Sequence, residues 1–267
     1  MIKIKNKYKY KYALIQYPKK QSISYKILNE YFKIMNFDCE YFDLSLSEDI
    51  FERYIPKILN KSEGLNITVP YKEKIIDYID PDQDVKNIKA CNLVYKNKGY
   101  NTDWIGFYET IKDFDFKDKN ILILGAGGAA KAIIYALYKK GIKNIDLINR
   151  TYSNSCILKE DMKQFIDINT YKKEKINEII LKNNFLINCT SVGMYDQRFE
   201  FNYNLLSKYS FIYDIVYKDT ELIKYANNKK INNKNGFDMW KNQAIENLKI
   251  WKIYDNKFEG VIKCLKT

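Results

Sequence analysis

A glycine-rich turn of the kind that binds dinucleotides lies near the middle of the chain. Residues 125–130 have the spacing G-x-G-x-x-A; they follow a continuous apolar run at 120–124 and precede a stretch of helical period at 131–140. The first glycine permits the tight turn, the second lets a pyrophosphate approach the backbone, and the last small residue lets the helix pack on the strand. We therefore expect a dinucleotide here, a ligand-free turn being the alternative; the residues concerned are Gly125, Ala126, Gly127, Gly128, Ala129 and Ala130.

An arginine placed about 20 residues further on indicates which dinucleotide binds, because NAD enzymes carry at this offset an acid that binds the ribose 2′-hydroxyl. Here Asp146 lies inside the next expected strand, and the strand is followed by Asn149, Arg150 and Thr151. A guanidinium at this position can pair with a 2′-phosphate. The sequence thus favours NADP over NAD; an arginine that only contacts solvent is the alternative.

Polar residues that could hold a substrate stand at the expected ends of strands. The chain has no histidine, which excludes a Ser-His-Asp triad, a Cys-His pair and the HExxH zinc site. Proton transfer must therefore use Lys, Asp, Glu, Tyr or Cys. Sites of α/β proteins form where strands end, and the residues found there are Ser22, Ser24, Thr68, Lys72, Asn92 and the run Asn101-Thr102-Asp103.

The elements that must position these residues alternate between strand and helix. In the first part of the chain we expect strands at 11–16, 37–43 and 64–69, and helices at 24–35, 49–60 and 72–78. Further on we expect helices at 104–111 and at 131–140, an amphipathic helix closed by Gly141, and strands at 120–124, 144–148, 185–189 and 211–216. This alternation predicts an α/β protein with mostly parallel sheets.

The composition is that of a globular protein with a basic surface. The 267 residues include 45 Lys and Arg against 33 Asp and Glu, a net charge of +12. Only three of the basic residues are arginine, the residue that nucleic-acid readers favour. A lysine-covered surface, with no nucleic-acid partner, is therefore the favoured interpretation. The segment 3–10 alternates lysine with apolar or aromatic residues; we expect an edge strand, with single-stranded nucleic acid as the alternative.

The cysteines and the apolar runs point to a reduced compartment. Five cysteines, an odd number with irregular spacing, argue against a disulfide framework and against a thiol-rich metal site, so we expect no metal. No apolar run is long enough to cross a membrane, and the N-terminus does not resemble a signal peptide. We expect a cytoplasmic protein that does not associate with membranes.

Eight segments, in order along nearly the whole chain, resemble motifs of the shikimate dehydrogenase family. The first is an opening strand that leads to the serines of an S-x-S motif, Ser22 and Ser24. The others are N-I-T-V-P-Y-K at 66–72, A-C-N at 90–92, N-T-D-x-x-G at 101–106, N-R-T at 149–151, N-x-T-x-x-G-M at 188–194, D-x-V-Y at 214–217 and G-x-x-M-x-x-x-Q-A at 236–244.

The resemblance implies a two-domain oxidoreductase that acts on a CH–OH group. Residues 1–103, completed by C-terminal helices at 239–267, would form a substrate-binding domain. Residues 104–238 would form a Rossmann domain that binds NADP, with the active site in the cleft between the two. The implied reaction is the reversible, NADP-dependent reduction of 3-dehydroshikimate to shikimate, on the route to chorismate and the aromatic amino acids. The implied partners are small molecules, and the protein would be a monomer or a homodimer.

The resemblance also assigns the site. The implied substrate-binding residues are Ser22, Ser24, Thr68, Lys72, Asn92, Asp103, Tyr217 and Gln243. Beyond the glycine-rich turn and N-R-T, the implied cofactor-binding residues are Thr190, Ser191, Met194, Ile215, Gly236 and Met239. Core packing is an equal alternative for the two methionines.

The implied catalytic residues are Lys72 and Asp103. Lys72 would protonate the developing alkoxide, and Asp103 would orient Lys72 and the ring. Because Lys72 follows Pro70, we expect it in the first turn of a helix, where the positive end of the dipole disfavours its charged form. Without the surrounding motif it would be one more solvated lysine. Ser22 and Ser24 would bind the substrate carboxylate, whereas Asn92 and Gln243 would read ring hydroxyls.

Some positions depart from the family pattern. Gln16 and Tyr17 stand where the family usually has Gly-Asn, Gln21 stands where it has His, and Tyr25 stands where Pro often follows the second serine. The segment 152–155 lacks a basic residue often found after N-R-T. Two competing functions therefore stay open. One is a quinate/shikimate dehydrogenase with relaxed or NAD-preferring cofactor use, and the other is a non-catalytic binding module for nucleic acid.

Overall fold

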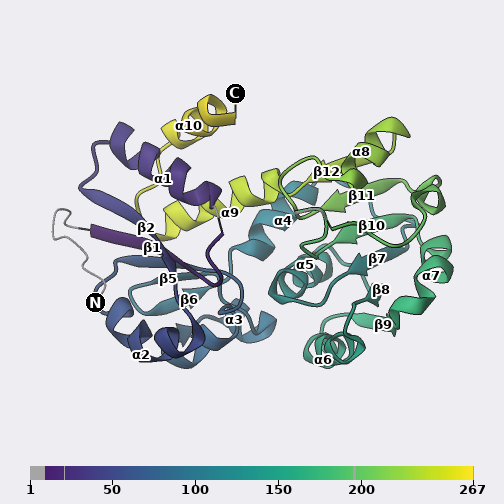
Figure 1. The fold of residues 1–267 in the computed structure, drawn as a ribbon, viewed down its shortest axis with the longest axis horizontal. Coiled ribbons are helices and arrows are strands. Elements are labelled where there is room, and N and C mark those ends of the chain that lie inside the picture. Colours follow the sequence, from purple (N-terminus) through teal and green to yellow (C-terminus); the bar gives the residue numbers. More distant parts are fainter. Residues whose placement is uncertain (1–9, 21, 195–196, 267) are drawn as a thin grey trace. The chain divides into compact units, whose positions relative to one another are not determined.

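The structure of this chain, a computed structural model, describes residues 10–20, 22–194 and 197–266 (Figure 1). The expected edge strand at 3–10 and the departure at Gln21 lie outside the described residues, apart from Tyr10. The chain divides into two compact units, residues 1–102 with 244–267 and residues 103–243. The chain returns from the second unit to the first between residues 243 and 244, within helix α9 (Phe237–Ile250). Each unit has its own sheet and core, and each is described by itself.

The first unit is built on a six-stranded mixed sheet of order β2-β1-β3-β5-β6-β4. Strands β2, β1 and β3 are parallel, β5 runs antiparallel to β3 and to β6, and β4 is parallel to β6. The bounds are β1 Tyr10–Gln16, β2 Cys39–Ser45, β3 Gly64–Ile67, β4 Asp80–Pro81, β5 Leu93–Tyr95 and β6 Lys98–Tyr100. The β5–β6 hairpin, which the sequence did not suggest, turns on Lys96 and Asn97. Both have positive φ, as the twist of a two-residue hairpin requires.

Helices cover both faces of this sheet, and alternate residues of β1 show why. Ala13 and Ile15 join a core with α2 and the short helix η1. Tyr12, between them, packs instead against Phe32 of α1 and against Trp251. This period of two is what a strand buried on both faces produces. The helices are α1 Ile23–Ile34, α2 Glu48–Leu59, the 3₁₀ helix η1 Lys74–Tyr78, α3 Gln83–Ile88 and α10 Lys257–Lys266.

The second unit is a doubly wound parallel sheet of order β12-β11-β10-β7-β8-β9. The chain starts in the middle at β7, runs outward to β9, and then returns to β10 on the other side. This is the classic dinucleotide-binding order, whose ligand binds where the direction reverses. The bounds are β7 Ile121–Leu124, β8 Asn144–Ile148, β9 Asp167–Tyr171, β10 Phe185–Asn188, β11 Phe211–Asp214 and β12 Asn232–Asn235.

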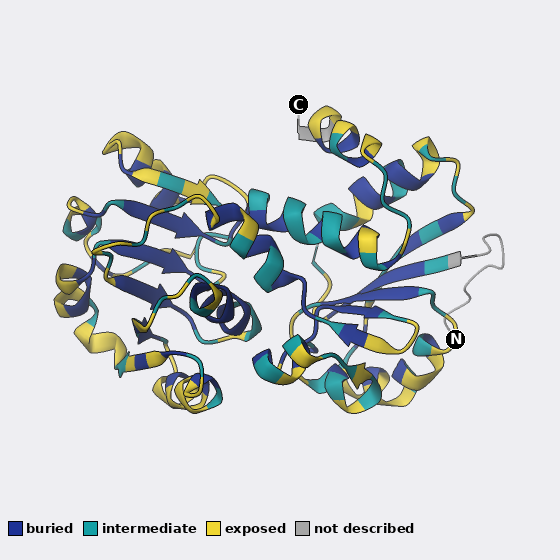
Figure 2. Ribbon diagram, turned by 180° about the vertical axis from the view of Figure 1, so that it is seen from behind, coloured by how far each residue is buried: buried dark blue, intermediate teal, exposed yellow. Residues whose placement is uncertain are grey.

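Helix α5 (Gly128–Lys139) of the second unit differs from the expected helix in its first residue and in its burial. It starts at Gly128, inside the glycine-rich turn, and Ala130–Leu137 are buried throughout, so the prediction of an amphipathic helix was wrong (Figure 2). The cause lies at Lys131, whose ammonium is buried and lies 3.1 Å from the Asp161 carboxylate of α6. The other helices are α4 Asp103–Ile111, α6 Tyr152–Met162, α7 Ile176–Lys182, α8 Glu221–Asn228 and the 3₁₀ helices η2 Lys173–Lys175 and η3 Tyr203–Leu206.

Most other expected elements are confirmed to within two residues at each end. Gly141, with φ of +84°, closes α5 as expected. The expected α/β class is confirmed, although the first sheet carries an antiparallel hairpin that the prediction of mostly parallel strands did not anticipate.

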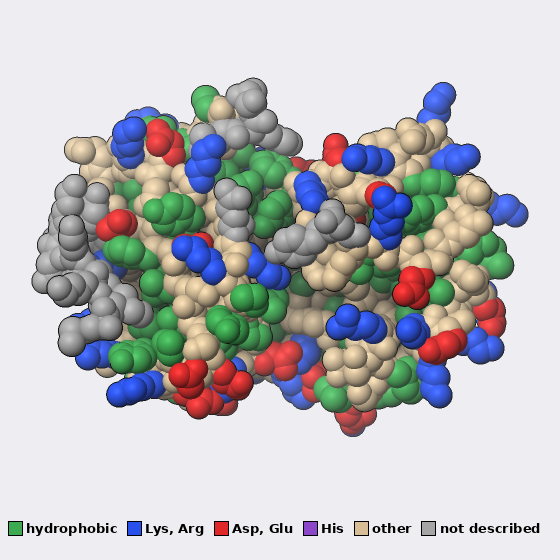
Figure 3. All heavy atoms as spheres, in the orientation of Figure 1, with side chains coloured by type: hydrophobic (Ala, Val, Ile, Leu, Met, Phe, Trp, Pro, Cys, Tyr) green, Lys and Arg blue, Asp and Glu red, His purple; other side chains and the backbone are tan. Residues whose placement is uncertain are grey.

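On the face of the molecule that can be seen in one view, the positive charge is dispersed. On the face shown in Figure 3, lysine and arginine side chains are scattered among acidic and polar ones. Among the described residues, no helix is both long enough and apolar enough to cross a membrane. All five cysteines lie within the described ranges as thiols.

Candidate active site

The glycine-rich turn has the geometry of a phosphate cradle. Gly125 has φ of +103°, and a Cβ added there would lie 2.8 Å from Cγ2 of Thr190. At Gly127 an added Cβ would meet no described heavy atom within 4 Å, so space is open beside this backbone. Helix α5 begins at the next residue, and the N–H groups of its first turn favour an anion at this place. The residues present therefore fit a pyrophosphate.

The loop after β10 lies directly beside this turn. Asn188 of β10 is the register partner of Leu124, and the Cys189 N–H donates to the Leu124 carbonyl at 2.7 Å. Thr190, Ser191 and Met194 follow on this loop. The structure thus brings two of the predicted cofactor segments together at the point where the strand order reverses. Burial raises the pKa of the Cys189 thiol, which does not favour a reactive thiolate there.

Arg150 lies exposed after β8, as a reader of a 2′-phosphate must. The Asn149 amide donates to the Thr151 carbonyl at 2.9 Å and shapes the turn that presents the guanidinium. Asp146 lies within β8, as predicted, and accepts hydrogen bonds from the amides of Asn169 and Asn183 at 3.1 and 2.8 Å. The Asp146 carboxylate is therefore hydrogen-bonded within the domain and does not lie at the carboxyl end of β8, where a ribose would bind.

Two further predicted cofactor residues meet next to β11. Gly236 donates its N–H to the Val216 carbonyl at 3.2 Å, and an added Cβ at 236 would collide with the backbone of Ile215. Only glycine allows this close approach. Tyr217 follows with 39% of its surface exposed.

Asp103 is the first residue of α4, and it is 8% exposed. One turn later, a Cβ added at Gly106 would lie 2.5 Å from the Met239 carbonyl and 2.9 Å from the Gln243 Cβ. Because residues three apart share a helix face, the first turn of α4 lies close to Gln243. The structure thus brings together the start of α4 and the first half of α9. Met239 is 8% exposed, as expected for core packing.

In the first unit, Gln16, one of the residues that depart from the family pattern, holds the segment that follows β1. The Gln16 amide donates to the Lys20 carbonyl at 2.8 Å and to the Asp43 carboxylate at 2.5 Å. Gln16 is 4% exposed, so this bond network is inside the protein. Ser22 then occupies the N-cap position of α1, and Ser24 lies in its first turn; both are half-buried. Tyr17 is 45% exposed.

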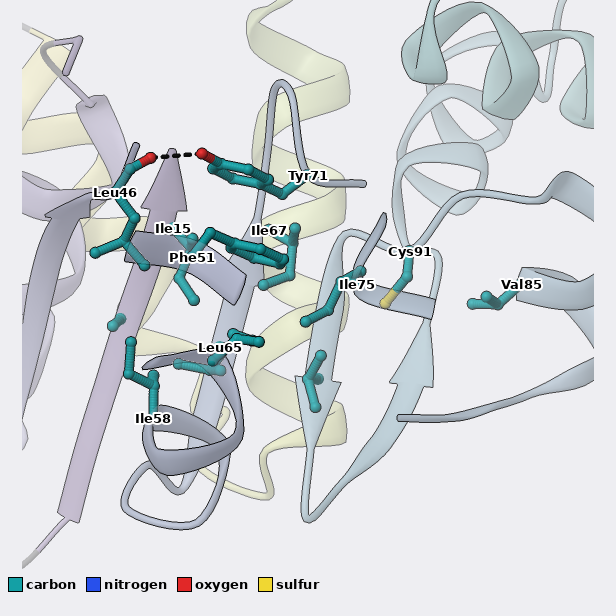
Figure 4. Packing of buried hydrophobic residues seen from close by; sticks show 13 residues of the cluster. Ile15, Leu46, Phe51, Ile58, Leu65, Ile67, Tyr71, Ile75, Val85 and Cys91 are labelled. Carbon is teal, nitrogen blue, oxygen red and sulfur yellow. Dashed lines mark hydrogen bonds between the residues drawn. The ribbon is translucent and has the colours of Figure 1, made fainter. Parts of the chain in front are cut away.

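Lys72 is held by the residue before it. The Tyr71 ring stacks on Phe51 with centroids 4.0 Å apart, and its hydroxyl donates to the Leu46 carbonyl at 2.5 Å (Figure 4). Thr68 is tied to β1, since its N–H donates to the Ile15 carbonyl at 3.1 Å. These anchors fix both ends of the turn 68–72.

The expected helical setting of Lys72 was wrong. Lys72 lies in a turn before η1, a 3₁₀ helix of five residues. The Ile75 N–H donates to the Tyr71 carbonyl at 3.0 Å, as in an α-helix, but the Lys72 carbonyl accepts the Cys91 N–H at 2.7 Å. Ile76 therefore donates to Glu73, and the α-helical pattern does not continue. The helix-dipole argument for tuning Lys72 therefore does not apply. The bond to Cys91 places Lys72 beside Asn92 instead.

Asn92 has protein partners for both ends of its amide. Its Oδ1 accepts the Thr102 N–H at 2.7 Å, and its Nδ2 donates to the Thr102 hydroxyl at 3.0 Å. Thr102 in turn donates to the Asn247 amide oxygen at 2.6 Å. Asn92 is 4% exposed, and its two bonds fix the position of Thr102, the residue that precedes Asp103.

Within the described ranges, no group of three or more acidic or thiol side chains is arranged to hold a metal ion.

The sequence did not single out a buried network at the ends of β10 and β11. Asn188, Asp214 and Thr220 are each less than 5% exposed and are joined by hydrogen bonds. Asn188 and Asp214 stood in recognised motifs, but their side chains carried no assigned role. A polar residue at the end of an otherwise apolar buried strand was the signal in the sequence that could have indicated this network.

Two family models match this chain. Residues 14–94 match the "Shikimate dehydrogenase substrate binding domain", and residues 109–208 match "Shikimate / quinate 5-dehydrogenase". Together the two segments cover most of the chain.

Individual proteins are similar over nearly the full length. The "Shikimate dehydrogenase (NADP(+))" of Thermotoga maritima is 37% identical over 250 residues, which are 92% of this chain and 95% of the relative. That of Aquifex aeolicus is 37% identical over 252 residues, 90% of each chain. The crystal structure of the Thermotoga maritima shikimate dehydrogenase superposes with a TM-score of 0.87 at 35% identity and covers 94% of this chain and 99% of that one. This chain belongs to the shikimate dehydrogenase family.

Proposed function

We propose that this chain catalyses the reversible, NADP-dependent reduction of 3-dehydroshikimate to shikimate. The observation that carries the proposal is the cradle at 125–130 followed by the exposed Arg150, in a chain whose relatives are named NADP(+) shikimate dehydrogenases. The reaction serves the formation of chorismate and the aromatic amino acids.

When bound, NADPH supplies the hydride for the reduction, and NADP⁺ takes it up in the reverse direction. The turn at 125–130 holds its pyrophosphate, and Asn149, Arg150 and Thr151 hold its adenosine end. Thr190, Ser191, Met194, Ile215, Gly236 and Met239 line its other half. Support comes from the adjacency of these segments at the carboxyl edge of one parallel sheet.

Lys72 and Asp103 manage the proton in this proposal. Lys72 donates a proton to the oxygen of the carbonyl that is reduced, and takes it back in the reverse direction. Asp103 fixes the ammonium and a ring hydroxyl. Support for a fixed Asp103 comes from its place at the start of α4, where a carboxylate is favoured, directly after the anchored Thr102.

The remaining polar residues orient the substrate. Ser22 and Ser24 donate hydroxyl hydrogen bonds to the substrate carboxylate, and Thr68, Tyr217 and Gln243 contact the ring. We assign Asn92 an indirect part, because its amide is engaged with Thr102. The substrate domain comprises residues 1–103 and 239–267, and the NADP domain residues 104–238. The protein works in the cytoplasm as a monomer or a homodimer, with small molecules as its partners.

The experiment is nicotinamide absorbance after mixing the pure protein with shikimate or quinate, each with NADP⁺ or NAD⁺. The proposal predicts turnover of shikimate with NADP⁺. Turnover of quinate with NAD⁺ would instead support a quinate/shikimate dehydrogenase that prefers NAD. The departures from the family pattern at Gln16 and Tyr17 are the reason to test this alternative. Silence in all four mixtures would contradict both.

A further inference from the structure

Two polar side chains at the ends of β10 and β11 are completely buried. Asn188 and Asp214 are register partners in neighbouring strands, and each is 0% exposed. The Asn188 amide donates to the Asp214 carboxylate at 2.9 Å. A buried carboxylate is costly unless hydrogen bonds compensate it, and the bond from Asn188 is part of that compensation.

Asn188 shapes the loop that follows it. Its Oδ1 accepts both the N–H and the hydroxyl of Thr190, at 2.9 and 2.7 Å. The Thr190 hydroxyl oxygen then accepts the Val192 N–H at 3.1 Å. The first half of the loop 189–194 is therefore folded around one amide group.

Asp214 does the same for the loop after β11. Its Oδ1 accepts the Val216 N–H at 3.0 Å, and its Oδ2 accepts the Thr220 hydroxyl at 2.7 Å. Thr220 caps α8 by accepting the Ile223 N–H. Gly193 packs against it, since an added Cβ there would lie 2.7 Å from the Thr220 Cγ2. One network thus joins both loops.

The sheet order indicates which half of a dinucleotide these loops face. In a doubly wound sheet the two halves of the ligand bind on either side of the strand at which the order reverses. Arg150 follows β8, so the adenosine half belongs over β7 to β9. The nicotinamide half then belongs over the ends of β10 and β11.

We propose that Asn188, Asp214 and Thr220 are positioning residues that hold the loops 189–194 and 215–219 in the form that binds the nicotinamide half of NADP. The inference rests on the proposed NADP-dependent function. It assigns these side chains no contact with the reacting atoms, because all three are buried beneath the loops.

The same sheet offers a matched control. Asp146 is a carboxylate that also accepts two amide hydrogen bonds, but it lies inside β8 and joins no loop at the carboxyl edge. Asp146→Asn therefore tests the general effect of neutralising an engaged carboxylate in this sheet. Thr220→Ser keeps the hydroxyl that Asp214 accepts, whereas Thr220→Val removes it at nearly constant volume.

The test is calorimetric binding of NADP⁺ and of 2′,5′-ADP, a fragment that contains only the adenosine half. We expect Asp214→Asn and Thr220→Val to weaken NADP⁺ binding roughly tenfold, the effect of losing one hydrogen bond to a charged group. Binding of 2′,5′-ADP should stay unchanged in both variants. Thr220→Ser and Asp146→Asn should bind both compounds as the wild type does.

Equal weakening of both compounds would overturn the inference, because it would indicate a general loss of structure. Unchanged NADP⁺ binding in the two variants would also overturn it. If Asp214→Asn does not fold, the comparison of Thr220→Val with Thr220→Ser decides. Wild-type protein that binds neither compound would contradict the proposed function itself, and the inference with it.

Discussion

The proposed chemistry depends on one lysine in a chain that is rich in them. Lys72 differs from its neighbours in its setting and not in its type. It lies half-buried in a turn whose ends are anchored by Thr68 and Tyr71. Two residues later, Lys74 forms ion pairs with Glu48 and Glu52. Substituting each of the two lysines in turn therefore distinguishes an effect of the position of Lys72 from a general effect of losing a lysine.

We expect Lys72→Ala to lower kcat roughly 10²- to 10⁴-fold, the usual contribution of a general acid. Its affinity for NADP⁺ should change little, since the proposed role of Lys72 is proton transfer and not cofactor binding. Steady-state kinetics with shikimate and calorimetry with NADP⁺ measure the two effects. Lys74→Ala is the control and should keep its turnover. A fully active Lys72→Ala variant would remove the acid–base assignment.

We expect Arg150→Ala to weaken NADP⁺ roughly ten- to hundredfold, as loss of hydrogen bonds to a charged phosphate requires. The KM for NAD⁺ should stay almost unchanged, because NAD⁺ lacks the 2′-phosphate. Arg198→Ala serves as the control, since Arg198 pairs with Glu221 on the surface. Equal losses for both cofactors would contradict the assigned role of Arg150.

At the scale of elements, the two helices next to the cradle are joined by one buried ion pair. Lys131 of α5 and Asp161 of α6 have side chains only 5% and 15% exposed. Helix α6 begins directly after Asn149-Arg150-Thr151. The pair thus joins the helix that begins in the glycine-rich turn to the helix that follows Asn149-Arg150-Thr151.

We expect Lys131→Met alone to destabilise the protein by about 3 kcal/mol, because the Asp161 carboxylate, only 15% exposed, loses the Lys131 ammonium. The double variant Lys131→Met/Asp161→Leu should recover most of that loss, since an apolar pair replaces both charges. Urea denaturation of the wild type, Lys131→Met, Asp161→Leu and the double variant gives the coupling. Additive losses in the double variant would show that the two residues do not act as a pair.

At the scale of the whole molecule, Asp214 should give the free energy of unfolding a distinct pH dependence. Burial raises its pKa from 3.8 to about 6, against the lowering effect of its three hydrogen bonds. Between these values the folded protein holds a proton that the unfolded chain has lost. The stabilising contribution of Asp214 is therefore full below pH 3.8 and falls as pH rises to about 6.

The measurement is urea denaturation of wild type and Asp214→Asn between pH 4 and 7. Relative to the variant, the wild type should lose about 3 kcal/mol over this interval, since each unit of pKa shift corresponds to ~1.4 kcal/mol. Comparing two proteins removes the contribution of the other carboxylates. A difference that does not vary with pH would contradict the raised pKa.

The sequence alone determined the class of fold and the cofactor segment. Period-two and period-3.6 patterns report directly which face of an element is buried. The turn at 125–130 is local, because its glycines, its strand and its helix are consecutive in the chain. Arg150 was found for the same reason, by its distance from that turn. The family motifs added the proposed catalytic residues, Lys72 and Asp103; among so many lysines, composition alone could not single out Lys72.

Only the tertiary structure decided which contacts the polar residues make. The Lys72 carbonyl bonds to Cys91, 19 residues away, and this contact prevents the helix that the local pattern predicted. Lys131 lies on a buried face because Asp161 meets it there. Asn188, Asp214 and Thr220 form one network because parallel pairing places the ends of two strands side by side. Contacts between residues distant in sequence leave no periodic signal, so a single sequence reports where an element lies but not what its polar groups bind.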